Sequence, residues 1–262
     1  MSAGKFFRGV VYLACCCAAL SVFGEEPALD EKRIESDEKW GIKFSPDKRT
    51  LVRYKTGLRV RTYTIPNGVL IIGKSALRGS SNLTEVTIPS SVTIIGEEAF
   101  KGCSNLTKIT IPAGVTEIGK GAFADCKNLR SVTIQSGPTA IGEKAFTDCR
   151  NLTEVTLPGT ITSIGKSAFA DCRGLGVLVI PAGVTEIGEK AFYGCRGLRN
   201  VTLPDTLTTI GIEAFKGCEG LRSVTIPASV TIIGKGAFRN CPCEFKVMEA
   251  HPDCTASDRS GF

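Results

Sequence analysis

The chain runs LTEVTIPSSVTIIGEEAFKGCSN through residues 83–105, and this stretch decides the fold. Its first part alternates, because Val86 and Ile88 are apolar, Glu85 and Thr87 are polar, and Pro89 follows. Side chains of a strand point alternately to its two faces, so the pattern predicts a short, half-buried strand that ends at the proline. The valine and the isoleucine then face a core, and the polar pair faces solvent.

The rest of the stretch predicts a chain that bends back toward the same core. Val92 and Ile95 form a second inward pair, and Gly96 lets the backbone turn. Ala99 and Phe100 close the coil with the aromatic ring inside. One such coil cannot bury its own apolar face, so it needs a neighbouring coil to stack against.

The same pattern recurs every 23 residues without insertion or deletion. Three columns define it: Cys103, Cys126, Cys149, Cys172, Cys195, Cys218 and Cys241; Phe100, Phe123, Phe146, Phe169, Phe192, Phe215 and Phe238; and Ile95, Ile118, Ile141, Ile164, Ile187, Ile210 and Ile233. Eight copies run from Val60 to Pro242, and the first is degenerate, with Leu77 and Ser80 in the phenylalanine and cysteine columns. The period predicts an α/β-type solenoid, a right-handed leucine-rich repeat coil with short strands, turns and 3-10 elements. We expect a parallel sheet on its concave face, about 35 to 40 Å long.

These repeats closely resemble the BspA-like leucine-rich repeats, in which L-x-x-V-T-I-P and I-G-x-x-A-F-x-x-C are the recurring blocks. The resemblance covers about 180 of the 262 residues. It extends to residues 44–54, FSPDKRTLVRY, which look like the hairpin that caps such arrays. The resemblance implies a secreted or surface protein of a host-associated bacterium or a protozoan. It also implies that the protein binds another protein, as several relatives that adhere to extracellular-matrix proteins do. It implies no catalytic residues.

Residues 1–24 have the pattern of a secretory signal peptide. Two basic residues precede an apolar stretch from Val10 to Phe23, and Gly24 supplies the small residue at the predicted cleavage site. The apolar stretch spans 14 residues, whereas a membrane-spanning helix needs about 20. We therefore expect no integral membrane segment after cleavage. Lipid attachment at Cys15 is the alternative to simple cleavage.

The charge changes sign in the segment that precedes the repeats. Residues 25–39 carry seven acidic and three basic side chains, which predicts an acidic linker that leads into the cap hairpin, the two together spanning residues 25–59. Seven basic residues lie between Lys43 and Arg61, against one acidic residue. A basic cap patch is predicted at Lys48, Arg49, Arg53, Lys55, Arg59 and Arg61. It could bind acidic glycans, anionic lipid headgroups or an acidic protein, or it could only protect a sheet edge from pairing.

The cysteine column favours buried free thiols that pack as small apolar residues. Cysteines in stacked coils would have parallel Cβ vectors, a poor geometry for a disulfide. No C-x-x-C motif occurs, so no metal site is predicted. Cys243 and Cys254 lie outside the column and could form a disulfide that ties down the C-terminal cap and tail, residues 243–262.

The composition argues against an enzyme and against a nucleic-acid-binding protein. The chain has a single His and no cluster of acid, base and nucleophile, so no catalytic residue and no cofactor is predicted. The net charge of +6 falls to +4 once the two basic residues of the first 24 are removed. That charge is too small to indicate nucleic-acid binding.

The outward positions of the first strand of each copy are the predicted binding face. Most carry threonine: Thr64, Thr87, Thr110, Thr133, Thr156, Thr202 and Thr225. The sixth copy breaks this column and places Val177 and Val179 outward, which favours an apolar centre for a binding patch, with sequence drift as the alternative. The predicted binding residues are Glu85, Lys108, Thr133, Glu154, Val177, Val179 and Asn200. The fourth copy also departs at residues 135–138, QSGP, where we expect a local distortion.

Two functions from different classes follow. The first is an exported binding protein, in the periplasm, on the cell surface or secreted, whose concave sheet engages a protein, with a host matrix component as the candidate partner. The alternative is a periplasmic structural scaffold without host contact. The charged hairpin and tail favour a monomer over a dimer paired through sheet edges.

Overall fold

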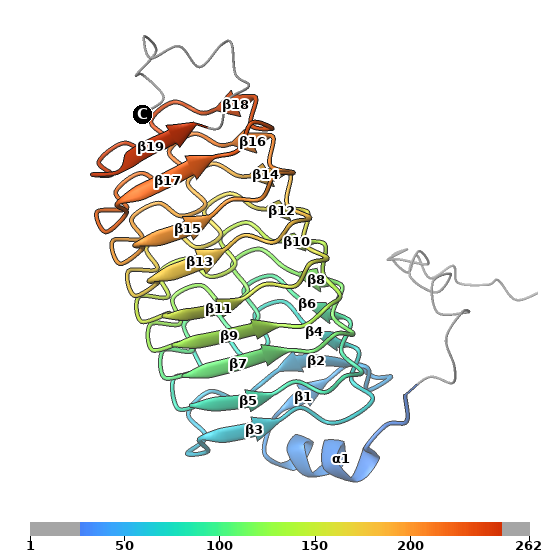
Figure 1. The fold of residues 1–262 in the computed structure, drawn as a ribbon. Coiled ribbons are helices and arrows are strands. Elements are labelled where there is room, and N and C mark those ends of the chain that lie inside the picture. Colours follow the sequence, from blue (N-terminus) through green and yellow to red (C-terminus); the bar gives the residue numbers. More distant parts are fainter. Residues whose placement is uncertain (1–26, 248–262) are drawn as a thin grey trace, which may run out of the picture.

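The structure is a computed structural model, and it describes residues 27–247. Figure 1 shows a solenoid of stacked coils, with one helix beside its first coils. Each coil contributes a longer strand and a two-residue strand, so two ladders of parallel strands run along the solenoid. The described chain between the strands runs in turns. The predicted leucine-rich repeat solenoid is confirmed.

The longer strands form the front ladder. Its members are β3 (Thr62–Thr64), β5 (Glu85–Thr87), β7 (Lys108–Ile111), β9 (Ser131–Ile134), β11 (Glu154–Thr156), β13 (Val177–Val179), β15 (Asn200–Thr202), β17 (Ser223–Ile226) and β19 (Glu244–Val247). Partners in register lie 23 residues apart along most of the ladder, as in the pair Val86 and Tyr63. Its hydrogen bonding divides it into three sheets, β3 to β11, β13 with β15, and β17 with β19.

The two-residue strands are the short strands predicted outside the concave sheet, and they pair into a back ladder that the sequence pattern did not predict. Its members are β4 (Ile71–Ile72), β6 (Ile94–Ile95), β8 (Glu117–Ile118), β10 (Ala140–Ile141), β12 (Ser163–Ile164), β14 (Glu186–Ile187), β16 (Thr209–Ile210) and β18 (Ile232–Ile233). Threonine hydroxyls support it, since Thr116 donates to the Thr93 carbonyl oxygen over 3.2 Å. Two residues are too short a run to show the alternation that indicates a strand.

The back ladder is interrupted between β8 and β10, where the sequence departs at residues 135–138. Gly137 has φ +155°, and a Cβ there would come within 2.3 Å of the Val115 carbonyl oxygen. The Gln135 side chain accepts a hydrogen bond from the Ala113 backbone N–H. The predicted distortion of the fourth copy is therefore present, and it separates two five-stranded sheets.

Phenylalanine rings form the centre of the core. The seven rings of the column stack nearly parallel, with centroids 4.8 to 5.4 Å apart. Leu77 lies buried at one end of the column, and Phe245 packs edge-on against Phe238 at the other. Each coil thus buries its ring against copies of itself.

Cysteine thiols form a second column beside the rings, and the column is more polar than predicted. Each Sγ donates to the backbone carbonyl oxygen 26 residues earlier, as Cys149 does to Phe123 over 3.2 Å. The buried cysteines are free, as the sequence predicted. The thiols therefore link neighbouring coils as well as filling space.

The N-terminal cap contains a helix where the sequence predicted an acidic linker. Helix α1 (Glu31–Lys39) begins after Asp30, whose side chain accepts from the Arg33 N–H, and it buries Ile34. The sequence pattern did not predict this helix because the segment is highly acidic. Capping and one buried face, rather than overall hydrophobicity, stabilise it. Strands β1 (Lys43–Phe44) and β2 (Thr50–Arg53) pair antiparallel, and β2 joins the back ladder beside β4.

The C-terminal end adds a ninth strand to the front ladder, within the segment predicted as cap and tail. Strand β19 pairs in parallel with β17, with Glu244 opposite Ser223. These partners lie 21 residues apart instead of 23, so the repeat period does not reveal the strand. Phe245 covers the last ring of the core.

Candidate functional site

The front ladder is interrupted between β11 and β13, at the copy whose sequence departs from the threonine column. In earlier coils the residue before the strand is often threonine, whose hydroxyl donates to a carbonyl of the preceding coil. Thr107 does so to Thr84, and Thr153 to Arg130, both over 3.1 Å. The sixth copy has Gly176 at this position, so it has no hydroxyl to make that bond.

A second feature changes at the same coil. Asparagines of the first copies form a ladder along the loops, in which Asn128 donates to Asn105 and Asn151 donates to Asn128, each over 3.1 Å. Gly174 occupies the next position and ends that ladder. Both kinds of side-chain contact are therefore lost at the coil where the front ladder is interrupted.

A hollow of about 500 Å³ opens at this interruption, and we call it the valine hollow. It is lined by Thr153, Glu154, Val155, Thr156, Gly174, Gly176 and Val177. Val155 is only partly buried, whereas the equivalent residues Val86, Ile109 and Val132 are buried. Val177 is 59% exposed and Val179 is 62% exposed. Apolar side chains therefore gather at a hollow on an otherwise polar face.

The other predicted binding residues lie on the same outward face of the front ladder. Glu85 is in register with Lys108, and Val177 is in register with Asn200. Glu154 lines the valine hollow, and Thr133, half-buried, is in register with Thr156. Glu154, Asn200 and the two valines form one neighbourhood, while Glu85 and Lys108 lie several coils away.

The six basic residues predicted as a cap patch do not gather at one hollow. Lys48 Nζ lies 2.6 Å from Glu38 Oε1, and an Arg49 guanidinium nitrogen donates to the carbonyl oxygens of Pro27 and Gly68. Lys48 and Arg49 thus connect segments of the cap to one another and to the first coil. Arg53 and Lys55 are exposed.

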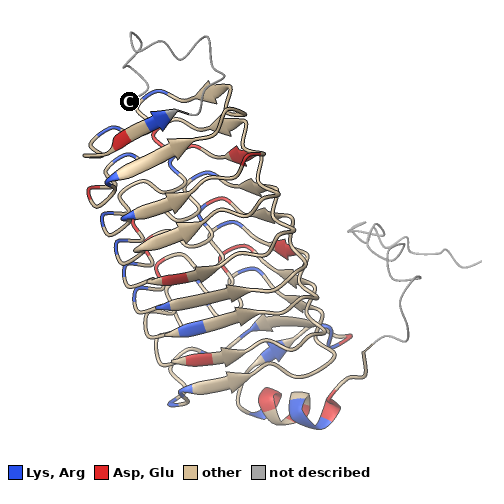
Figure 2. Ribbon diagram, viewed as in Figure 1, with Lys and Arg blue, Asp and Glu red and all other residues tan. Residues whose placement is uncertain are grey.

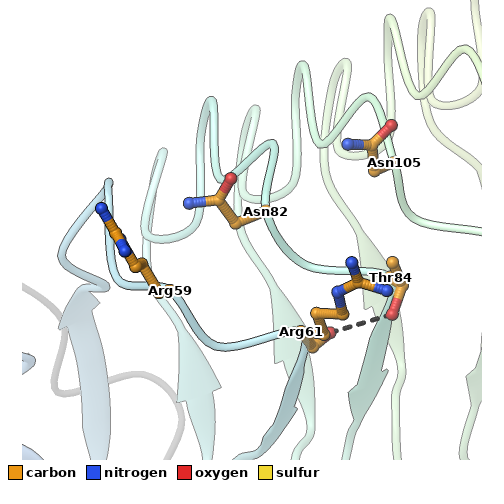
Figure 3. Close-up of a pocket in the computed structure, with 5 residues that line it drawn as sticks. All are labelled: Arg59, Arg61, Asn82, Thr84 and Asn105. Carbon is orange, nitrogen blue, oxygen red and sulfur yellow. Dashed lines mark hydrogen bonds between the residues drawn. The ribbon is translucent and has the colours of Figure 1, made fainter.

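Arg59 and Arg61 line a different hollow, of about 460 Å³, with Asn82, Thr84 and Asn105. Figure 3 shows this hollow at the loops that lead into the first front strands, with Thr84 bonded to the Arg61 carbonyl oxygen.

The cap also holds a buried carboxylate that the sequence pattern did not single out. Tyr63 Oη donates to Asp37 over 2.8 Å, and Arg33 Nε lies 3.1 Å from the same carboxyl. Burial raises the pKa of Asp37, and the bonds from Tyr63 and Arg33 offset part of that shift. The Tyr54 ring packs 4.8 Å from the Tyr63 ring. This cluster joins α1 to the first coil.

Two buried thiols of the cysteine column, Cys103 and Cys195, are unsuited to chemistry in the folded protein. Burial raises the pKa of Cys103 and of Cys195 to about 12, so both are protonated at neutral pH. Within residues 27–247, no three His, Cys, Asp or Glu side chains converge in a set able to hold a metal ion. The predicted Cys243 to Cys254 disulfide and the predicted signal peptide involve residues outside the described part of the chain.

No helix of the described segment is long and apolar enough to cross a membrane.

Sequence reasoning found the two exposed valines but not the hollow beside them. Val155 is typical of the residues at its strand position, such as Val86 and Val132, so nothing in its identity indicates partial exposure. The available signal was Gly176 at the position directly before the strand, where Thr107 and Thr153 stand, together with Gly174 in the asparagine column.

Comparisons with known proteins agree with this geometry. The family model of the BspA type leucine-rich repeat region matches six copies, over residues 54–176 and 162–248. The crystal structure of a T. pallidum leucine-rich repeat protein is 31% identical, with a TM-score of 0.61, over 69% of this chain and 86% of that one.

A leucine-rich repeat protein from Eubacterium ventriosum is 27% identical, with a TM-score of 0.55, over 84% of this chain and 52% of that one. No curated protein matches the chain significantly. Leucine-rich repeats of this type are non-enzymatic scaffolds for protein interaction. The chain belongs to the BspA-type leucine-rich repeat family.

Proposed function

We propose that this protein is exported and, as a monomer, binds another protein through the open face of its front ladder, with the valine hollow at the centre. The observation that carries the proposal is the exposure of Val177 and Val179 beside the hollow. Interfaces commonly have an apolar centre and a polar rim, and Glu154 and Asn200 supply polar groups at the edge of this patch.

A host extracellular-matrix or surface protein is the proposed partner. This part of the proposal rests on the family resemblance and on the signal-peptide pattern of residues 1–24. The valines stand on strands of a rigid stacked scaffold, which keeps their geometry before binding and lowers the entropy lost on association.

The experiment measures binding of the purified protein to a panel of purified matrix proteins, with the double variant Val177→Glu, Val179→Glu as the test. Two buried charges at the centre of an interface should weaken binding by about 100-fold or more. The matched control is Thr62→Glu with Thr64→Glu, which adds the same charge at the same two exposed strand positions on β3, away from the valine hollow. Equal binding by the double valine variant and the wild type would refute the proposed surface.

Protease treatment of intact and lysed cells separates host contact from the scaffold alternative. A surface protein loses its signal in intact cells. Protection in intact cells, together with no binding to any matrix protein, would reject adhesion and favour a periplasmic scaffold.

A further inference from the structure

The front ladder has a second interruption, between β15 and β17. A hollow of about 470 Å³ lies there, lined by Arg196, Gly197, Arg199, Asn200, Gly220 and Arg222. We call it the arginine hollow. Figure 2 shows that basic residues recur along the loops that lead into the front strands, the edge on which this hollow lies.

Two of its arginines are uncompensated. Arg199 and Arg222 are exposed, and within residues 27–247 neither forms an ion pair. Arg196 Nε lies 3.5 Å from Glu219 Oε1, so one carboxylate borders the hollow. By contrast, Arg150 and Arg173 on the same edge lie 2.8 Å and 3.2 Å from Asp148 and Asp171.

Within residues 27–247, no side-chain hydrogen bond or ion pair joins Arg199 or Arg222 to a neighbouring coil. Arg199 and Arg222 stand in the column where Thr107 and Thr153 clamp one coil to the next through their hydroxyls. Arginine has no hydroxyl to donate in the same way, and the ladder is interrupted between these two residues, although it is continuous at Arg130 in the same column. Like charges on adjacent coils also repel. A bound anion would remove this repulsion.

The floor of the hollow leaves the guanidinium groups accessible. Gly197 and Gly220 stand where earlier copies have asparagine, and a Cβ at Gly197 would come 2.4 Å from the Arg173 carbonyl oxygen. Backbones of adjacent loops therefore approach closely, and no side chain from these positions covers the arginines.

We propose that the arginine hollow binds a sulfated segment of a linear polysaccharide. Guanidinium groups donate paired hydrogen bonds to planar or tetrahedral oxyanions. The lining offers arginine, asparagine and glycine and no apolar side chain, which suits sulfate and hydroxyl groups and lacks the anchor pocket that a bound peptide needs. The hollow at Arg59 and Arg61 lies on the same edge, so a linear chain could contact both.

The test measures binding of the purified protein to a heparin-derived dodecasaccharide, to its desulfated form, to a polyglutamate peptide and to inorganic sulfate, at physiological salt. Arg199→Gln with Arg222→Gln should weaken binding of the sulfated sugar about tenfold, since it removes two exposed guanidinium charges that would pair with the sulfate groups of the sugar. The matched control, Arg150→Gln with Arg173→Gln, removes the same charge from the same edge and should change binding less than about threefold.

Four outcomes overturn the proposal. They are equal weakening in both double variants, equal binding of the desulfated sugar, binding of polyglutamate as tight as that of the sulfated sugar, and inorganic sulfate binding as tightly as the sugar. Polyglutamate binding would instead assign the hollow to an acidic protein. Matrix-protein binding through Val177 and Val179 should be unchanged in Arg199→Gln with Arg222→Gln, which keeps this result separate from the proposed function.

Discussion

Individual polar residues in this solenoid depend on a neighbour one coil away. Each thiol of the cysteine column reaches a carbonyl of the preceding coil, whereas Ser80, in the first copy, is buried and its hydroxyl has no partner among the described residues. An unpaired buried hydroxyl costs about 1 to 3 kcal/mol. The first copy therefore lacks a contact that later copies share.

The Asp37 carboxylate in that cap makes local stability depend on pH. Its pKa in the folded protein is raised above 3.8, mainly by burial, so the native state binds this proton more tightly than the unfolded state does. The stabilisation from this group is thus fully present below the unfolded pKa and is lost as pH rises through the folded pKa.

Tyr63→Phe removes the hydroxyl that supports the charged form of Asp37. We expect the free energy of unfolding to fall by about 1 to 3 kcal/mol at pH 7, because the buried carboxylate loses a hydrogen bond, and to fall less at pH 4, where more of Asp37 is protonated. Urea unfolding at both pH values measures this difference. In an Asp37→Asn background the loss should no longer depend on pH. A loss of the same size at both pH values in the Asp37 protein would contradict the linkage.

At the scale of strands, threonine hydroxyls clamp one coil to the next in both ladders, but in the front ladder they do not alone decide where it is continuous. The back ladder has a threonine clamp in consecutive copies and is interrupted only at the QSGP copy within residues 27–247. The front ladder is interrupted twice within the same range, where Gly176 and Arg222 take the threonine position, but it is continuous at Arg130 and Arg199, which stand in the same column. Hollows lie at both interruptions, and a third lies beside Arg61, where β3 and β5 are paired.

Gly176→Thr should close the first interruption. A Cβ at Gly176 meets no atom within 4 Å, and the new hydroxyl can donate to the Thr153 carbonyl oxygen. The expected gain is about 1 to 2 kcal/mol in the free energy of unfolding, from one hydrogen bond and lower entropy of the unfolded chain. Hydrogen exchange should slow at Val177 and its neighbours.

Gly159→Thr is the control for this change. A Cβ at Gly159 would also meet no atom within 4 Å, but this glycine lies in a turn. The substitution should therefore give the entropic gain without slower exchange at β13. If Gly176→Thr leaves exchange at β13 unchanged, the missing hydroxyl is not the cause of the interruption.

At the scale of the whole molecule, stability is a sum of coil-to-coil contacts along one axis. The ring stack makes this explicit, since Phe169 contacts Phe146 and Phe192, while Phe100 stacks only on Phe123 among the described rings. A substitution in the middle of the stack weakens the contacts with both neighbouring coils and separates the two halves of the array.

Phe169→Ala should lower the free energy of unfolding by about 3 to 5 kcal/mol and also lower the urea m-value, because the two halves then unfold less cooperatively. Phe100→Ala, at the end of the stack, should keep the wild-type m-value. Urea titrations followed by circular dichroism compare the two. Identical m-values would show that the stack contributes through burial alone.

The extent of prediction differs between the core and the edges of the solenoid. The columns at Phe100 and Cys103 were identified correctly as buried, since they recur in phase with one another. Helix α1 and strand β19 were not predicted, because neither follows the 23-residue repeat. The helix is stabilised by its cap and one buried face. Strand β19 lies 21 rather than 23 residues after its partner β17.

Taken by itself, the sequence determined the coil, its inward columns and the outward position of Val177 and Val179. A strict 23-residue period is sufficient for this, because every coil meets a copy of itself and the same positions must be buried in each. Only the tertiary structure decided where adjacent coils separate, that Val155 opens into a hollow, and that Arg199 and Arg222 share another. Those features depend on hydrogen bonds between one particular pair of coils, and a consensus repeat does not contain that information.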